Sequence, residues 1–279
     1  MLRKIFLAVV LSFFRAACLG AACLESSVYA AELKVAVAAN FKPSLEKLAK
    51  AFAAETGHRL LISSASTGVL YNQITNGAPF DVFLSADSLR PERLEQQGLV
   101  LKGSRHPYAL GELVLWSPGF SGKDGKNNPM TLEDLAVYQG RLAIANPATA
   151  PYGLAAQQVL EKLGFWSPFR SRLVQGASIQ QAWQFVASGN VPVGLVAKAQ
   201  LVGDKNNDGH IFPIPATLYD PIRQDLVILN RTSQPEAAKA LVAFILSPSV
   251  QNTLAKQGYI PVLPKMAGKA TSEHRGEAL

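Results

Sequence analysis

A cluster of hydroxyl side chains lies where a short apolar run gives way to a helical pattern. The run Arg59–Ser63 leads into a turn with three hydroxyls and a glycine: Ser64, Ser66, Thr67 and Gly68. Free N–H groups at a helix start, with hydroxyl donors beside them, suit a compact anion because the helix dipole is positive there. One Ser or Thr also serves as an ordinary helix cap, so this segment alone leaves both interpretations open.

Three other segments repeat this order of strand end, polar turn and helix start. Ala39 and Asn40 follow the opening strand, and the Asn40 side-chain amide offers a donor besides the backbone. Tyr152 lies in the first turn of a helix that follows a proline-rich loop, and Ile179 begins another helix after Gly176. Each segment alone reads as a plain cap or loop. Four such helix starts, two from each half of the chain, together favour an anion site.

The elements that must position these residues alternate between strand-like and helical patterns. Apolar runs at 33–39, 59–63 and 81–86 are each followed by a helical pattern, and the alternation resumes with the runs 141–145, 172–175 and 193–197. In the first helix Leu45, Leu48 and Phe52 recur on one face. Strands alternating with helices of this length predict an α/β fold with mostly parallel sheets flanked by helices.

Two extended runs divide the chain. Glu112–Trp116 opens into a loop rich in Gly, Asn and Lys, and Asp225–Asn230 precedes two further helices. If both runs cross between lobes, residues 31–112 begin lobe 1, 113–224 form lobe 2, 225–265 return to lobe 1, and the two crossovers form a hinge. Ligands of open α/β sheets bind beyond the carboxyl ends of strands, here between facing helix starts. The polar tail 266–279 is expected to be disordered.

The first 30 residues have the pattern of a secretory signal peptide. Arg3 and Lys4 precede an apolar run at 5–14, which is shorter than the roughly 20 residues that span a bilayer, and a small-x-small pattern predicts cleavage near Ala30. Both cysteines, Cys18 and Cys23, lie in this segment, so the exported chain would contain no disulfide. A lipid anchor at Cys23 is a minor alternative.

Charge and motifs exclude several function classes. Residues 1–30 hold three of the 27 basic and one of the 20 acidic residues, which leaves a formal charge of +5, and no Lys/Arg block of the kind that marks nucleic-acid contact occurs. Asp204–Gly209 resembles half of a calcium loop, but the twelfth position, Pro215, is not a ligand. The four histidines show no zinc pattern: His58, His106, His210 and His274.

Two rival classes remain. A secreted hydrolase is disfavoured because the chain lacks G-x-S-x-G, H-E-x-x-H and P-loop motifs. A purely structural interaction module is the second rival class.

The chain resembles the periplasmic molybdate-binding proteins of ABC transporters over nearly all of its length after residue 30. The segments that carry the resemblance are VAVAANF, SSASTG, QITNGAPFDVFLSAD, ANPATAPYGLAAQQVLEKLG and AKQGYIPVLP. The resemblance implies a type II periplasmic binding protein fold. In that family neutral donors from both lobes hold a tetrahedral oxyanion, with neither a cofactor nor a free metal cation.

The resemblance also implies a set of ligand-binding residues: Ala39, Asn40, Ser66, Thr67 and the backbone N–H groups of Tyr152 and Ile179. Some members of the family have a tyrosine where this chain has Ala197 and an alanine where it has Tyr152. Ala197 therefore offers no side-chain donor, and the chain looks like the branch with asparagine and tyrosine.

The chemistry of the four helix starts agrees with such a ligand. They contain no Lys or Arg, so hydrogen bonds and dipoles would balance the charge of a fully ionised oxyanion. Phosphate keeps a proton and benefits from a carboxylate acceptor, but Asp81 and Asp87 are expected to be a strand-start residue and a helix cap.

The sequence therefore predicts a monomeric periplasmic receptor, not an enzyme, that captures molybdate and tungstate and delivers them to an ABC permease. The alternatives are a receptor for another tetrahedral oxyanion, such as sulfate, or a secreted hydrolase.

Overall fold

The computed structural model describes residues 30–120, 129–202 and 210–262, and Ala31–Leu279 forms one compact unit. The predicted signal peptide with Cys18 and Cys23, the half calcium loop at 204–209 and the tail 266–279 lie outside the described residues. Among the described residues, no helix has both the length and the apolar character needed to cross a membrane.

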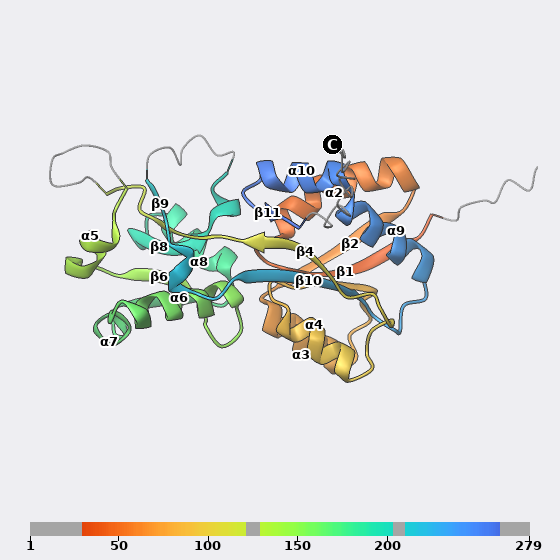
Figure 1. Ribbon diagram of the computed structural model, residues 1–279, viewed down its shortest axis with the longest axis horizontal. Helices are drawn as coiled ribbons and strands as arrows, with labels where there is room; N and C mark the ends of the chain where they lie inside the picture. The colour runs from red at the N-terminus through yellow and green to blue at the C-terminus, as the bar shows by residue number, and fades with distance from the viewer. Residues whose placement is uncertain (1–29, 121–128, 203–209, 263–279) are drawn as a thin grey trace, which may run out of the picture. The chain divides into compact units, whose positions relative to one another are not determined.

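The first sheet has six strands in the order β11-β4-β10-β3-β1-β2. They are β1 (Glu32–Ala38), β2 (Arg59–Ala65), β3 (Val82–Leu84), β4 (His106–Gly111), β10 (Ile222–Ile228) and β11 (Ile260–Pro261). One face carries α2 (Lys42–Thr56), α9 (Pro235–Leu246) and α10 (Pro248–Lys256), and the other carries α3 (Thr67–Thr75) and α4 (Leu89–Gln96) (Figure 1). We call this sheet and its helices lobe 1.

The second sheet has five strands in the order β7-β6-β8-β5-β9. They are β5 (Leu113–Trp116), β6 (Leu142–Ala145), β7 (Leu173–Gly176), β8 (Val193–Ala197) and β9 (Ile211–Pro213). The helices are α5 (Leu132–Val137), α6 (Pro151–Lys162), α7 (Trp166–Phe169) and α8 (Ile179–Ala187), with 3-10 turns η1 (Lys198–Gln200) and η3 (Ala216–Leu218). We call these elements lobe 2.

Each lobe buries apolar side chains on both faces of its sheet. In lobe 1, Phe41, Leu45 and Phe52 pack with α9 and α10 on one face, and Leu70 and Leu94 of α3 and α4 cover the other. In lobe 2, α6 packs on one face and α8 on the other. This three-layer arrangement confirms the predicted two-lobe α/β fold.

The sheets are mixed, which corrects the expectation of mostly parallel sheets. Strands β1, β2 and β3 pair in parallel, as do β6, β7 and β8. Strand β10 is antiparallel to both β3 and β4, and β5 is antiparallel to both β8 and β9. The antiparallel pairs arise mainly because β5 and β10, the first strand that the chain forms after each crossing, run against the strands of the βαβ units.

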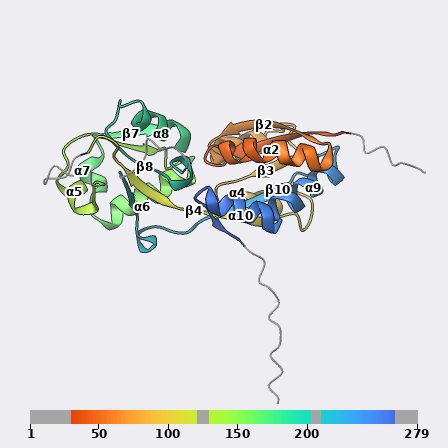
Figure 2. The same ribbon diagram turned by 90° about the horizontal axis from the view of Figure 1, so that it is seen from above.

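The chain passes between the lobes twice. Strand β4 leads through Glu112 directly into β5, and the return runs from β9 through η3 into β10, so that β4 and β10 lie side by side (Figures 1 and 2). The Leu113 N–H donates to the Tyr219 hydroxyl at 3.2 Å and ties the two crossings together. Strand β10 begins at Ile222, three residues before the expected Asp225. The predicted domain limits stay a prediction.

Candidate functional site

All six residues predicted to bind the ligand line one small cavity. Besides Ala39, Asn40, Ser66, Thr67, Tyr152 and Ile179, the lining comprises Ala38, Ala86, Ala150 and Pro151. These residues come from the carboxyl end of β1 and the starts of α3, α6 and α8, which belong to both lobes. None of the lining residues carries a charged side chain, so any ligand in this cavity meets only neutral groups.

Asn40 follows β1 and is 2% exposed. Its carbonyl oxygen accepts a hydrogen bond from the Tyr259 hydroxyl at 2.9 Å, and its Nδ2 donates to Gln224 Oε1 at 2.8 Å. Its Oδ1 has no hydrogen-bond partner among the described residues. The neighbouring Ala39 donates its N–H to the Ala65 carbonyl. Ala39 therefore lines the cavity but has no free N–H to donate to a ligand.

The start of α3 presents two hydroxyl groups. Ser66 is the N-cap residue, yet its side chain makes no capping bond and its buried Oγ has no partner among the described residues. Thr67 Oγ1 accepts from the Ala86 N–H at 3.1 Å, which leaves the hydroxyl proton for another acceptor. A serine that forgoes the cap it usually makes is available for a ligand.

Lobe 2 contributes backbone donors. Tyr152 and Ile179 lie in the first turns of α6 and α8, where N–H groups have no intrahelical acceptor. No hydrogen bond from either N–H to another described residue is found. Ser178 caps α8 through the Gln181 N–H, so the helix start is otherwise well formed. Both N–H groups add to the positive dipole end of their helices.

The Tyr152 side chain has contacts of its own, separate from the role of the Tyr152 backbone N–H. Its hydroxyl lies 3.4 Å from Gln224 Nε2 on β10, and a Cβ added to Gly111 would lie 2.0 Å from the hydroxyl oxygen. Gly111 therefore makes the room that Tyr152 occupies. Burial raises the pKa of Tyr152 well above its ordinary value, so the hydroxyl keeps its proton.

The two aspartates near the site have other partners, as predicted. Asp87 Oδ1 accepts from the Arg90 N–H at 2.9 Å and so caps α4. Asp81 precedes β3, and its carboxylate accepts from the Lys34 N–H and the Thr232 hydroxyl, both at 2.7 Å. Neither aspartate lines the cavity.

Within the described parts of the chain, no group of three His, Cys, Asp or Glu residues could hold a metal ion.

The family model for bacterial extracellular solute-binding proteins matches residues 33–260, which span both sheets. The chain belongs to this family. Membership confirms the expectation of a binding protein that works outside the cytoplasm, and it removes the hydrolase alternative.

Individual relatives show which members of the family this solute-binding protein resembles. The chain is 47% identical to the molybdate-binding protein ModA of Azotobacter vinelandii, over 86% of this chain and 94% of the relative. It is 41% identical to ModA of Rhodobacter capsulatus, over 83% and 89%. The solved periplasmic molybdate-binding protein of Azotobacter vinelandii superposes with a TM-score of 0.75 at 42% identity, over 84% of this chain and all of that one.

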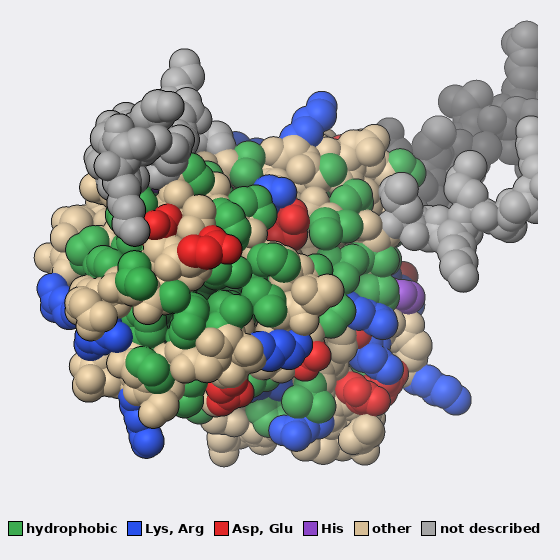
Figure 3. Space-filling model, turned by 60° about the vertical axis from the view of Figure 1, so that its left-hand side comes forward, with side chains coloured by type: hydrophobic (Ala, Val, Ile, Leu, Met, Phe, Trp, Pro, Cys, Tyr) green, Lys and Arg blue, Asp and Glu red, His purple; other side chains and the backbone are tan. Residues whose placement is uncertain are grey.

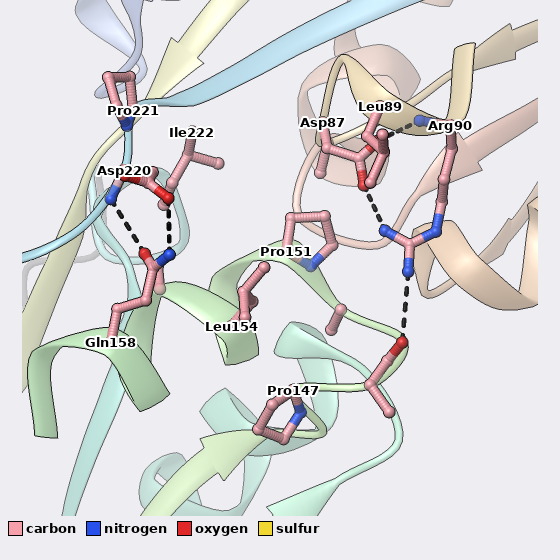
Figure 4. Close-up of a pocket in the computed structure, with 14 residues that line it drawn as sticks. Asp87, Leu89, Arg90, Pro147, Pro151, Leu154, Gln158, Asp220, Pro221 and Ile222 are labelled. Carbon is pink, nitrogen blue, oxygen red and sulfur yellow. Dashed lines mark hydrogen bonds and ion pairs between the residues drawn. The ribbon is translucent and has the colours of Figure 1, made fainter. Parts of the chain in front are cut away.

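Direct bonds also join the two lobes beside the cavity. The Gly68 N–H of α3 donates to the Thr149 carbonyl at 2.8 Å, and Arg90 Nη2 lies 3.3 Å from the Ala148 carbonyl oxygen. Arg90 also pairs with Asp87, which balances its charge. Figure 4 shows Arg90 reaching from α4 toward the loop before α6. These contacts join the two lobes of the solute-binding protein at this edge of the cavity.

A groove of about 230 Å³ adjoins the cavity and shares Ala86, Ala150 and Pro151 with it. Leu89 and Leu154 face it from opposite lobes, and Gln158 bonds to Asp220 at its far side (Figure 4). On the molecular face drawn in Figure 3, Lys and Arg side chains alternate with acidic and apolar ones, without a continuous basic patch.

Sequence reasoning missed the residues behind the cavity. Gln224, Tyr108 and Tyr259 are buried polar groups that contact Asn40 or its neighbours, and Gly111 gives Tyr152 its space. Gln224 stands between two charged residues and before the apolar run expected at Asp225–Asn230, so no pattern in the sequence marked it as a buried side chain.

Gly153 is the glycine on which the position of the Tyr152 N–H depends. A Cβ there would lie 2.4 Å from the Ala145 carbonyl oxygen, a backbone atom at the end of β6. Gly153→Ala is therefore expected to push the first turn of α6 off the sheet and to lower the free energy of unfolding by about 1 to 3 kcal/mol, as overpacking does. Urea denaturation measures this loss.

The matched control for this prediction is Gly119→Ala. A Cβ at Gly119 meets no atom of a described residue within 4 Å, so the stability of this variant should stay near that of the unchanged protein. Equal stability of the two variants would show that α6 does not need the close approach at Gly153.

Proposed function

We propose that this solute-binding protein captures molybdate between its lobes and delivers it to an ABC permease. The observation that carries the proposal is the set of neutral donors that line one buried cavity and have no acceptor among the residues that the structure describes. They are the hydroxyls of Ser66 and Thr67 and the N–H groups of Tyr152 and Ile179, with the Asn40 side chain beside them. Buried donors without acceptors destabilise a protein, and an acceptor-only guest removes that cost.

The charge pattern supports a fully ionised oxyanion. Two of the helix starts supply backbone N–H groups and dipoles, which favour an anion without a paired cation. Among the described residues, no carboxylate lines the cavity to accept the proton that phosphate keeps at neutral pH. Relatives named as molybdate-binding proteins support the choice of molybdate. Tungstate has the same charge and shape, and we propose it as a second ligand.

Capture is proposed to occur by hinge closure. Lobe 1 would hold the anion first through Asn40, Ser66 and Thr67, and the N–H groups of lobe 2 would complete the shell. An anion that binds the closed form more tightly shifts the population toward it. We further propose that the protein is a monomer and is exported by a leader cleaved near Ala30.

A thermal-shift panel with molybdate, tungstate, sulfate and phosphate tests the proposal. A ligand at about 100 times its dissociation constant stabilises by roughly 2.7 kcal/mol, which for a chain of this size raises the melting temperature by roughly 5 to 11 °C. Molybdate and tungstate are expected to give this shift and phosphate none.

The panel also decides between the candidate ligands. A shift with sulfate but not with molybdate would favour the sulfate-receptor alternative. A shift with phosphate alone would overturn the argument from the missing carboxylate, and no shift with any of the four anions would overturn the anion site.

A further inference from the structure

Gln224 on β10 is a buried polar residue that bonds to both lobes. It has no exposed surface, and its Oε1 accepts from Asn40 Nδ2 at 2.8 Å and from the Tyr108 hydroxyl at 3.1 Å. Its Nε2 donates to the Tyr152 hydroxyl at 3.4 Å. Asn40 and Tyr108 belong to lobe 1 and Tyr152 to lobe 2. Gln224 is therefore a polar junction directly behind the cavity.

Two groups at this junction are unpaired. Asn40 Oδ1 is buried without a partner among the described residues. The Tyr152 hydroxyl accepts from Gln224, but no acceptor for its own proton is found among the described residues. Because an unpaired buried donor and an unpaired buried acceptor both destabilise, this arrangement is poorly satisfied.

Turning both carboxamides over pairs these groups without moving heavy atoms, since the oxygen and NH2 of a carboxamide have nearly the same shape. Gln224 Nε2 then donates to Asn40 Oδ1 and to the Tyr108 hydroxyl, whose proton goes to the Ser85 carbonyl at 2.9 Å. Gln224 Oε1 accepts from Tyr152. The group left over is Asn40 Nδ2, a donor directed away from Gln224.

We propose that Gln224 is a positioning residue that turns the Asn40 carboxamide so that its NH2, and not its oxygen, faces the bound oxyanion. The inference rests on the proposed function, because an acceptor in the cavity makes the turned arrangement the fully paired one. With the opposite orientation the Asn40 oxygen would face the oxygens of the anion, acceptor against acceptor. Gln224 thus acts through Asn40 and not by touching the anion.

A double-mutant cycle measured by calorimetry with sodium molybdate tests this inference. Asn40→Ala removes a hydrogen bond to a charged partner and is expected to weaken binding about 10- to 100-fold. Gln224→Met keeps the side-chain length without hydrogen bonds and is expected to weaken binding about 10-fold. If Gln224 acts through Asn40, the double variant binds no more than about 3-fold more weakly than Asn40→Ala alone.

Multiplying effects in the double variant would overturn the inference, and so would full affinity in Gln224→Met. Gln251→Met is the matched control. Gln251 is equally buried in lobe 1 and donates to the Tyr108 carbonyl at 3.0 Å, but it has no bond to Asn40. Its effect should multiply with that of Asn40→Ala, and the same coupling at Gln251 would count against a specific role for Gln224.

Side-chain amide NMR on the unmutated protein tests the same inference where a variant fails to fold. In the molybdate-loaded protein, the Gln224 NH2 protons are expected to give their strongest NOE to the Tyr108 ring. A strongest NOE to the Tyr152 ring would overturn the turned arrangement. Calorimetry on the same sample separates the two proposals: no heat with molybdate overturns the function and the inference together, whereas binding without the expected NOE overturns the inference alone.

Discussion

Replacing Asn40 and Thr67 together by alanine is expected to weaken molybdate binding by about two to four orders of magnitude. Each residue is proposed to give one hydrogen bond to a doubly charged anion, and such bonds contribute about 1.5 to 3 kcal/mol each. Both side chains are almost fully buried at the cavity, so water does not replace them easily. Isothermal titration calorimetry with molybdate measures the loss.

A matched double variant controls for the number and type of substitutions. Asn72→Ala with Thr75→Ala makes the same changes on α3, at exposed positions whose side chains do not line the cavity. This variant should bind molybdate with unchanged affinity. Melting temperatures without anion show whether either variant has lost stability, in particular because Thr67 Oγ1 accepts from the Ala86 N–H. Equal affinity in the two double variants would refute the site assignment.

Raising the pH above about 10 is expected to destabilise the protein by about 4 kcal/mol per pH unit. Burial raises the pKa of Tyr108, Tyr152 and Tyr259 above the value of about 10 that the unfolded chain keeps. The folded state therefore holds three protons that the unfolded state releases. Their stabilisation is complete below pH 10 and is lost as the pH rises toward the folded-state values, at about 1.4 kcal/mol per unit for each tyrosine.

Urea denaturation at a series of alkaline pH values measures this slope, and tyrosinate absorbance shows whether ionisation accompanies unfolding. Tyr152→Phe removes one titrating group and should reduce the slope by about one third. Free energies of unfolding that stay level above pH 10, or tyrosines that ionise while the protein remains folded, would contradict the argument from burial.

Local patterns predict many of the elements well. The strand Val193–Ala197 begins and ends where the sequence places it, and the two helices expected after Asn230 are present as α9 and α10. Gly57 and Gly77, which follow α2 and α3, have φ of +74° and +94°, in the left-handed region where glycine commonly ends a helix. These features depend on neighbours along the chain, so a short window contains the information.

The missed elements depend on distant partners. Strand β4 contains Pro107 and pairs with β10 and β11 from the far end of the chain, and β11 is only two residues long. The start of β10 at Ile222 is likewise set by its pairing with Gly111. Apolar periodicity does not show such pairings, so the antiparallel half of each sheet and the mixed topology escaped prediction.

The candidate site likewise has one part that the sequence predicts and one part that depends on distant partners. Its lining residues follow strands and begin helices, and the sequence with its family resemblance placed six of them at one cavity. Gln224 lies 184 residues from Asn40 along the chain, and its role exists only because β10 passes behind the cavity. Its burial and its partners could be found only in three dimensions.

The backbone hydrogen bond between Gly68 and Thr149 has a consequence for the protein without ligand. It joins the lobes through backbone atoms of residues that do not line the cavity, so part of the free energy that favours the proposed closure comes from contacts within the protein. The choice of anion and the fraction of ligand-free protein that is closed therefore depend on different contacts. A change at Arg90, which does not line the cavity, is therefore expected to alter how often the unloaded protein closes, without removing any group proposed to contact the anion.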